Sequence, residues 1–462
     1  MNLKSILLAG REILPIIEGG KGINVSTGKT AGAFAANDCM GTFSGVNPDL
    51  IIDGKSVQPV PVGNSRTLRQ ASLVDLGVQG CLDQAAIAHE ESRGRGIVAM
   101  NILWEQGASR ELLERVLSRA KGTIRSISCG AGMPFQLSEI CANNKVFYNP
   151  IVSSARALQL LWKRSYSKFK DWIGAVIYED PWIAGGHNGL SGSDNKDAPE
   201  KPLARLREIR KFMNSVGLVA VPIVIAGGVW WLNEWKDYIE DKEIAPVAFQ
   251  FGTRTMVVRE SPIGDDVKLR LMNSEPGDVV LQQFSPTGLY SSALRNGFLK
   301  ELEDSLGRQV EFSESAEGEF ALPVVMAGSG KTVYVREGDR ARLEALKAGG
   351  FVNALKTPGG TLMFANDEKY ARIQEDMRAC SGCLSACLFS GWDQKGERVI
   401  MPDPRSFCIQ RALQDIAHGA PADEGLIFSG QIAHRFKTDP FYRGGTFIPS
   451  VEELVAQIKT GY

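Results

Sequence analysis

Two short stretches, Val221-Pro-Ile-Val-Ile-Ala-Gly-Gly-Val229 and Val247-Ala-Phe-Gln-Phe-Gly-Thr253, decide the fold of this chain. Each is an apolar run that ends abruptly at glycine, which is typical of a strand buried on both faces of a parallel sheet. Gly227-Gly228 and Gly252-Thr253 would then lie at the carboxyl ends of neighbouring strands, where backbone N–H groups can cradle phosphate. In a (β/α)8 barrel the loops after strands 7 and 8 often hold a cofactor phosphate. The sequence therefore predicts a barrel built around a phosphorylated cofactor.

Eight apolar runs that end in small or polar residues give the strand count such a barrel needs. They are Ile13–Glu18, Cys39–Phe43, Ile97–Asn101, Thr123–Ser128, Lys145–Asn149, Trp172–Tyr178, Val221–Ala226 and Pro246–Phe251. Helical patterns separate several of them, at Ser109–Lys121, Ala155–Phe169, Pro202–Val216 and Leu232–Asp241. Because strands and helices alternate, we expect an α/β fold, a (β/α)8 TIM barrel.

The chain also contains material that the barrel does not need. We expect the barrel over residues 1–260, an inserted subdomain over 261–379, a cysteine-cluster segment over 380–427 and a helical closure over 428–462. Within the barrel, the long stretch 45–96 carries a helical pattern around Leu82–Glu91. In the last segment, Ser450 and Glu453 predict the capping box of a terminal helix.

Composition narrows the class of protein. The 462 residues carry a formal net charge of -1, so overall charge gives no support for nucleic-acid binding, which is unlikely though not excluded. No apolar run reaches the ~20 residues that span a bilayer, and the apolar piece near the N-terminus is too short for a signal peptide. We expect a cytoplasmic protein with no membrane partner, and the sequence leaves its oligomeric state open.

A histidine marks the candidate catalytic face. His187 follows Gly185-Gly186 just after the sixth predicted strand, and the chain has only four histidines. At this position it could act as a general base or orient a polar substrate, and the glycines would let a flat ring approach the backbone. A solvent-exposed turn histidine is the alternative reading.

Three motifs carry a family resemblance. Glu179-Asp-Pro-Trp-Ile-Ala-Gly-Gly-His187-Asn-Gly189, Ile225-Ala-Gly-Gly-Val229 and Gln250-Phe-Gly-Thr-Arg254 follow one another at barrel-like spacing. In this the chain resembles the nitronate monooxygenase (2-nitropropane dioxygenase-like) family of FMN-dependent barrels. It departs from that family in carrying Gly20-Lys21-Gly22 where members usually have Gly-Met-Gly, in its greater length and in its clustered cysteines.

The resemblance implies a set of FMN contacts. Gly227, Gly228, Gly252 and Thr253 would bind the phosphate, and Gln250 and Asn101 would contact the isoalloxazine ring or the ribityl chain. Gly19 and Gly20 would lie along the flavin, as would the Gly185-Gly186 pair. By the same resemblance, His187 would be the active-site base or a substrate ligand.

Four late cysteines form a separate motif: Cys380, Cys383, Cys387 and Cys408. The spacing C-x2-C-x3-C with a distant fourth thiolate suits a 4Fe–4S cluster, and it is similar to the cluster loop of flavin-dependent 2,4-dienoyl-CoA reductases. A structural zinc site and unconnected buried thiols are the alternatives.

Together these features predict an FMN-dependent oxidoreductase that passes electrons between a 4Fe–4S cluster and FMN. Its partners would be a small organic or acyl-thioester substrate and an external electron donor. The alternatives are a nitronate monooxygenase with a structural metal site and a flavin-dependent RNA-modifying enzyme.

Overall fold

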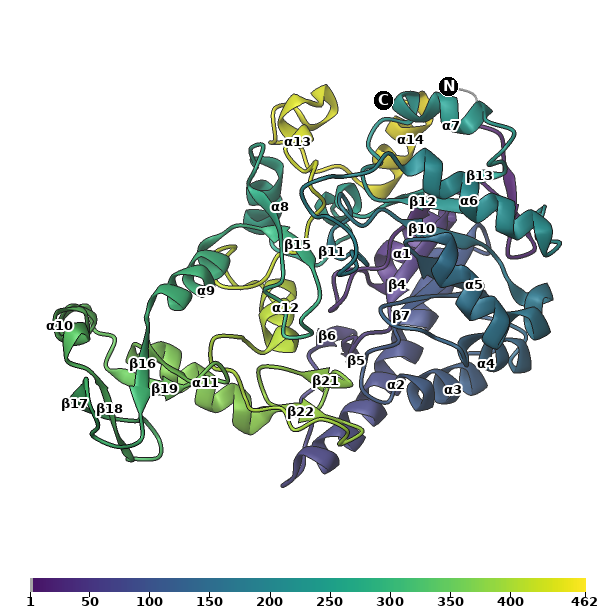
Figure 1. The fold of residues 1–462 in the computed structure, drawn as a ribbon. Coiled ribbons are helices and arrows are strands. Elements are labelled where there is room, and N and C mark those ends of the chain that lie inside the picture. Colours follow the sequence, from purple (N-terminus) through teal and green to yellow (C-terminus); the bar gives the residue numbers. More distant parts are fainter. Residues whose placement is uncertain (1–2) are drawn as a thin grey trace.

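The fold is a closed eight-stranded parallel barrel, as the sequence predicts. The computed structural model describes residues 3–462, and around the barrel the strand order is β3, β4, β7, β8, β9, β10, β12, β13. These strands are Ile16–Glu18, Met40–Ser44, Ile97–Leu103, Ser126–Gly130, Phe147–Val152, Val176–Glu179, Ile223–Ala226 and Val247–Phe251. The barrel forms the right half of the molecule in Figure 1.

The first predicted strand, Ile13–Glu18, is shorter in the structure than expected. Pro15, which has no backbone N–H, precedes β3, and the residues before it turn away. There β1 (Ile6–Leu8) and β2 (Arg11–Ile13) form an antiparallel hairpin. Its residues Leu8 and Ile13 belong to the same buried cluster as Ile17 and Met40, so the hairpin closes one end of the barrel interior.

Helices cover the outside of the barrel (Figure 1). They are α1 (Gly28–Ala36), α2 (Arg66–Glu91), α3 (Ser109–Arg119), α4 (Leu137–Asn143), α5 (Ala155–Arg164), α6 (Pro202–Ser215), α7 (Lys236–Glu240) and α14 (Val451–Thr460). Three differ from expectation. Helix α2 extends far upstream of Leu82 and is capped by Ser65, and α5 ends at Arg164 because Ser165 leaves helical geometry before a 3₁₀ turn. The predicted helix Leu232–Asp241 is a 3₁₀ turn, Leu232–Trp235, followed by the short α7.

The terminal helix α14 has the predicted capping box. Ser450 accepts a hydrogen bond from the backbone of Glu453, whose side chain accepts one from the backbone of Ser450. The apolar face of α14, including Leu454 and Ile458, lies in the same core cluster as barrel strands and α1. Helix α14 therefore joins α1 in the layer of helices that surrounds the barrel.

A second layer lies over the carboxyl ends of the barrel strands. Its three-stranded antiparallel sheet joins β11 (Gly186–His187), β15 (Ser291–Leu294) and β14 (Val279–Gln282). Its other elements are α8 (Asp265–Met272), α12 (Ile409–Ala417), α13 (Arg435–Thr438), and the hairpins β5–β6 (Leu50–Ile52, Lys55–Val57) and β21–β22 (Ala386–Cys387, Trp392–Asp393). Ser292 and Ser291 of β15 thus pair with Gly186 and His187 of β11.

An outlying sheet lies far from the barrel, at the left of Figure 1. Its order is β17 (Phe320–Val325), β18 (Thr332–Arg336), β16 (Gln309–Ser313), β20 (Thr361–Ala365), β19 (Asn353–Lys356). It has a buried cluster of its own, which includes Val333, Val335 and Leu343 of α10 (Arg340–Ala348). Helices α9 (Gly297–Gly307) and α11 (Asp367–Ala379) connect it to the second layer.

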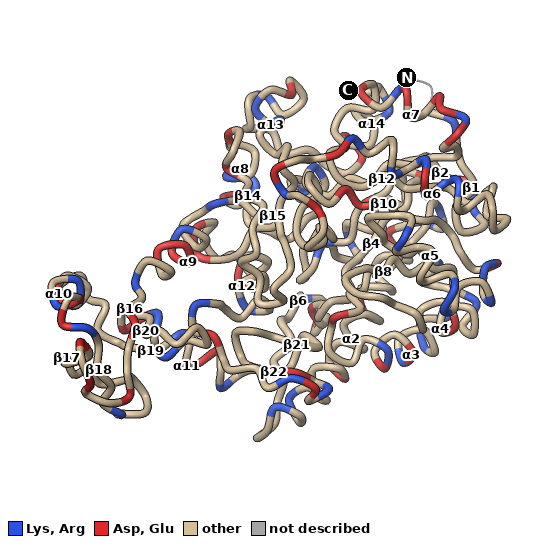
Figure 2. The backbone as a smooth tube through the Cα atoms, viewed as in Figure 1, with Lys and Arg blue, Asp and Glu red and all other residues tan. Residues whose placement is uncertain are grey.

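The surface carries mixed charge. Lysine and arginine lie interspersed with aspartate and glutamate over most of the visible elements (Figure 2). Within residues 3–462, no helix combines the length and the apolar character that a bilayer span requires.

Candidate functional site

One cavity of about 240 Å³ lies at the carboxyl ends of the barrel strands. All the residues that the sequence singled out for the flavin line it: Gly19, Gly20, Asn101, Gly185, Gly186, His187, Gly227, Gly228, Gln250, Gly252 and Thr253. The structure thus brings together positions up to 234 residues apart in the chain, from Gly19 to Thr253. Their individual contacts with FMN stay predictions.

The loops after β12 and β13 form an anion cradle. Gly227 and Gly228 adopt left-handed backbone angles, with φ of +93° and +72°, which glycine reaches without strain. Within residues 3–462, no hydrogen-bond partner is found for the backbone N–H groups of Gly227, Gly228, Gly252 or Thr253. A Cβ on Gly252 would meet no protein atom within 4 Å. Unpaired N–H donors around open space fit the phosphate of FMN.

Amide side chains form part of the cavity floor. Gln250 lines the cavity without a side-chain hydrogen bond to any described residue, and its amide lies against Gly19, 3.1 Å from where a Cβ would be. Asn101 is buried, and its Cβ is 2.3 Å from the position of a Cβ on Gly20. Only glycine therefore fits at position 20, and the Gln250 amide is free to contact a ring edge.

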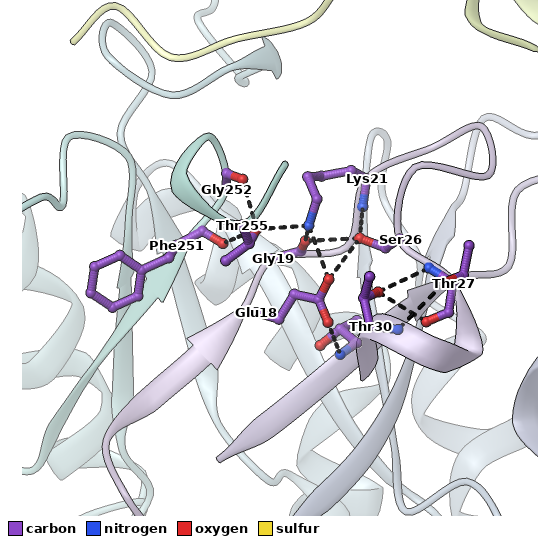
Figure 3. Close-up of polar contacts among 10 residues, drawn as sticks. Glu18, Gly19, Lys21, Ser26, Thr27, Thr30, Phe251, Gly252 and Thr255 are labelled. Carbon is purple, nitrogen blue, oxygen red and sulfur yellow. Dashed lines mark hydrogen bonds and ion pairs between the residues drawn. The ribbon is translucent and has the colours of Figure 1, made fainter. Parts of the chain in front are cut away.

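A buried ion pair braces the loop after β3 against the phosphate loop (Figure 3). The Lys21 Nζ donates to Glu18 Oε1 at 3.2 Å, to the Gly19 carbonyl at 2.7 Å and to Thr255 Oγ1 at 2.9 Å. Thr255 in turn donates to the Gly252 carbonyl at 2.7 Å. Burial raises the pKa of the Glu18 carboxyl and lowers the pKa of Lys21, and their pairing opposes both shifts.

His187 is held by two hydroxyl groups from the second layer. Its Nε2 lies 2.8 Å from Ser285 Oγ and 3.2 Å from Thr287 Oγ1, and its ring meets Phe428 edge to face at 5.4 Å. Burial lowers the pKa of His187 to about 4. At neutral pH the imidazole is therefore uncharged, a form suited to orienting a polar substrate or accepting a hydrogen bond.

The roof of the cavity comes from residues late in the chain. Helix α12 contributes Ile409, Leu413 and Ile416, and the following loop contributes Leu426, Ile427 and Phe428. The residues that follow Phe428 contact the loops after β13 and β10. The Gly430 N–H donates to Thr253 Oγ1, and the Gln431 N–H donates to the Ile183 carbonyl. This roof is mostly apolar, in contrast to the glycine and amide floor.

The four late cysteines are neighbours in space, but they do not form a ligand set. All are free thiols, and Cys383 lines the cavity. Burial raises the pKa of Cys383, and the charges of Cys408, Cys387 and Cys380 raise it further. Even so, no three His, Cys, Asp or Glu side chains in the described part of the chain lie in an arrangement that could hold a metal ion.

The cysteine segment is fixed against the barrel by its backbone. Gly107 donates to the Cys383 carbonyl at 2.9 Å, and the side chains of Arg69 and Gln70 from α2 donate to the Cys380 and Gly382 carbonyls, each at 2.9 Å. The segment therefore docks where β7 ends.

Sequence reasoning missed several residues of the site. Glu179 lies in the quoted His187 motif without an assigned role, yet its side chain lines the cavity. Ser285 and Thr287 hold His187 from a stretch about 100 residues downstream. The signal for Glu179 was its place at a strand end, whereas no local pattern links residues 285–287 to His187.

One solved structure that resembles this chain has a TM-score above 0.5 and shares its fold. The enoyl reductase domain of MlnA, from the macrolactin biosynthesis cluster of Bacillus amyloliquefaciens, matches 97% of this chain and 93% of its own, at 12% identity and a TM-score of 0.56. FabK from Thermotoga maritima covers 63% of this chain and 74% of its own, at 18% identity and a TM-score of 0.42. Nitroalkane oxidase from Streptomyces ansochromogenes covers 62% and 78%, at 16% identity and a TM-score of 0.45.

The family is decided by a sequence model. No curated protein matches the chain. The nitronate monooxygenase family model matches residues 64–379, which is more than half of the chain and includes β7 to β13 of the barrel. Together with the anion cradle, this match shows that the chain belongs to the nitronate monooxygenase family and is an FMN-dependent oxidoreductase.

Proposed function

We propose that this protein uses FMN to transfer electrons to or from a small organic substrate or an acyl thioester. The observation that carries the proposal is that one cavity is lined both by the anion cradle and by the apolar roof. Leu413, Ile416, Leu426 and Ile427 are each at most 8% exposed, so the roof is packed and offers an apolar surface. Such a surface suits the hydrocarbon part of a substrate.

The state of His187 favours a reductase over an oxidase that first deprotonates a neutral nitroalkane. A general base works best when its pKa lies near the operating pH. With its pKa lowered to about 4, His187 is a weak base that serves better to orient a substrate carbonyl or nitro group. Bound FMN would supply the redox chemistry, and an external donor would supply its electrons.

The test is a substrate comparison on the flavin-loaded protein. NADH and NADPH should reduce bound FMN under anaerobic conditions, and an enoyl thioester should reoxidise it faster than a nitronate does. His187→Ala should slow this reoxidation and leave FMN bound. Faster turnover of nitronates than of any enoyl substrate would reject the reductase assignment and favour the monooxygenase alternative.

We also propose, as a second candidate, that the four late cysteines bind a 4Fe–4S cluster. Two observations support it: the spacing of the thiols, and the electrostatic contact of Cys383 with the other three beside the cavity. Since these side chains are not arranged as ligands, loading would require the segment to rearrange. The donor set fits thiolate-bound iron or zinc, and we assign no step of the reaction to it.

An anaerobic iron, zinc and sulfide assay decides this candidate. A cluster predicts about four irons per chain and a broad absorption that Cys383→Ser abolishes. Cys141→Ser, which alters a buried thiol in the barrel core, is the matched control and should leave the iron content unchanged. Zinc in place of iron would make the segment a structural metal site, and absence of both would leave the thiols as packing residues.

The RNA-modifying alternative gains no support from the surface. Lysine and arginine positions are interspersed with aspartate and glutamate positions along the backbone in Figure 2, and the formal net charge is -1. Binding to RNA that weakens steeply with added salt would revive this alternative.

A further inference from the structure

The ionisable side chains around the cavity differ in whether they already have hydrogen-bond or ion-pair partners within the protein. Five side chains of this kind line it: Lys21, Glu179, His187, Arg254 and Cys383. Lys21 is bonded to Glu18, and His187 to Ser285 and Thr287. The Glu179 carboxyl makes no hydrogen bond or ion pair with any residue in the described range 3–462.

The strand geometry directs Glu179 into the cavity. Along β10, Ile177 belongs to the cluster inside the barrel, whereas Tyr178 packs outward against the helices. Because side chains alternate along a strand, Glu179 shares the inner face with Ile177, at the carboxyl end. Its register partner on β12 is Ala226, which also lines the cavity. The carboxyl therefore lies at the floor of the cavity, beside the small apolar side chain of Ala226.

This setting keeps a proton on Glu179. Burial, and the nearby charge of Asp180, raise the pKa of Glu179 to about 8. The carboxylate Oδ1 of Asp180 is itself committed to the backbone N–H groups of Trp182 and Ile183. At neutral pH, Glu179 is mostly the uncharged acid.

No neighbouring cation offsets this effect. Of the two cations that line the cavity, Lys21 is paired with Glu18. Arg254 donates to the Trp230 carbonyl and to the Tyr442 hydroxyl, and its guanidinium lies 3.7 Å from Asp439. His187, the remaining basic group, is uncharged at neutral pH.

We propose that Glu179 is the proton donor of this site, a neutral carboxylic acid that gives its proton to the atom in the cavity that becomes basic when electrons arrive. This inference rests on the proposed function. When bound and reduced by the external donor, FMN would supply a hydride, that is one proton with two electrons, to the substrate. The O–H bond of Glu179 breaks as a bond forms from that proton to the substrate, which leaves FMN oxidised, the substrate reduced and Glu179 as a carboxylate that solvent reprotonates.

The proposal gives His187 and Glu179 complementary roles. His187 stays uncharged and can accept a hydrogen bond, whereas Glu179 stays protonated and can donate. Two titratable groups whose surroundings push their protonation in opposite directions are a recurring arrangement in acid–base catalysis. Glu179 is the donor because it is the one without a protein partner.

Infrared spectroscopy of the FMN-bound protein tests the protonation state without any substrate. The difference between wild type and Glu179→Gln should contain the carbonyl band of a protonated carboxylic acid at pH 6.5, and this band should fade with a midpoint near pH 8. Glu208→Gln, which changes an exposed carboxylate, should remove no such band. If Glu179→Gln removes only a carboxylate band at pH 6.5, the acid is ionised and the proposal fails.

Two further measurements test the transfer and identify the acceptor. With substrate, Glu179→Gln should lower kcat at pH 7 by about 100-fold or more, with little change in KM, because the amide donates a hydrogen bond but cannot give up a proton. Without substrate, the midpoint potential of bound FMN should change its pH dependence near pH 8 in wild type alone if the flavin accepts the proton. Wild-type values in both measurements would overturn the proposal.

These outcomes separate Glu179 from the proposed function. Lack of turnover with every enoyl and nitro substrate would reject the function, whereas the infrared and potential measurements would still decide the role of Glu179. A loss of FMN from Glu179→Gln would instead show a structural role, and Glu179→Asp, which keeps the acid, should then restore binding.

Discussion

Replacing Lys21 by methionine should destabilise the protein in a pH-dependent way. Methionine is the usual residue at this position in the family that the sequence resembles. The Lys21 side chain is 12% exposed and the Glu18 side chain 0% exposed, and Nζ makes three hydrogen bonds, so it is the charged ammonium form that is held. Removing one partner of a buried ion pair costs about 3–5 kcal/mol, because the other charge is left without compensation. For 462 residues, unfolding entropy is about 1 kcal/mol per degree, which converts this cost to a Tm lower by about 3–5 °C.

The sign of the pH dependence follows from Glu18. Burial already raises the pKa of this carboxyl in the folded protein, and loss of Lys21 raises it further. A carboxyl with a raised folded pKa is best tolerated below its unfolded pKa of about 4.3, and stability falls as pH rises through the folded value. The loss of stability in Lys21→Met should therefore be smaller at pH 5.5 than at pH 8.

Urea unfolding at both pH values, with FMN saturating in every sample, checks this reasoning. The double variant Glu18→Gln/Lys21→Met removes the stranded charge and should recover most of the loss at pH 8. An equal loss at both pH values, or a double variant as unstable as the single one, would refute the assignment of the cost to Glu18.

Three further perturbations have defined outcomes. Gly252→Ala places a methyl group in the open cradle and should weaken FMN binding about tenfold or more in fluorescence titration, which is about 1.4 kcal/mol. Gly338→Ala, at another open position, should leave FMN affinity unchanged. Unchanged affinity in Gly252→Ala would show that the phosphate does not bind at this cradle. Ser285→Ala removes the 2.8 Å hydrogen bond between Ser285 Oγ and His187 Nε2, which is worth about 1 kcal/mol. Steady-state turnover should therefore fall about fivefold while FMN stays bound. A larger drop, together with loss of FMN, would show a structural role for Ser285. Ser450→Ala removes the N-cap of α14 and should lower the unfolding free energy by about 1 kcal/mol in urea; no change would mean that α14 adds little to the barrel.

The barrel was readable from sequence because its strands are buried on both faces. Val221–Ala226 and Pro246–Phe251 are continuous apolar runs with sharp glycine ends, and the structure begins them within two residues of those bounds. The glycines of the cradle were readable for the same reason, since strand ends must meet at one edge of a parallel sheet.

The rest of the site depends on contacts that no local pattern encodes. Ser285 reaches His187 through the β11–β15 pairing, which joins segments about 100 residues apart. The sequence places Glu179 at a strand end, but it does not show that the residue lies on the inner face of β10 or that its carboxyl has no partner. The long extent of α2 was missed because its first two turns, residues 66–72, contain no buried residue, although Leu73, Val74 and Val78 of the following turns are buried.

The order in which the site is assembled differs from the order in which the chain is made. The eight barrel strands have all been synthesised once the chain reaches Phe251. The roof of the cavity lies between Cys383 and Phe428, and α14, which packs on the outside of the barrel, follows later still. Residues up to about 260 alone therefore leave the cradle open and an apolar patch on α1 uncovered. A closed flavin cavity forms only after the segment 383–428 has folded over the barrel, and until then a partly made chain exposes apolar surface that favours aggregation.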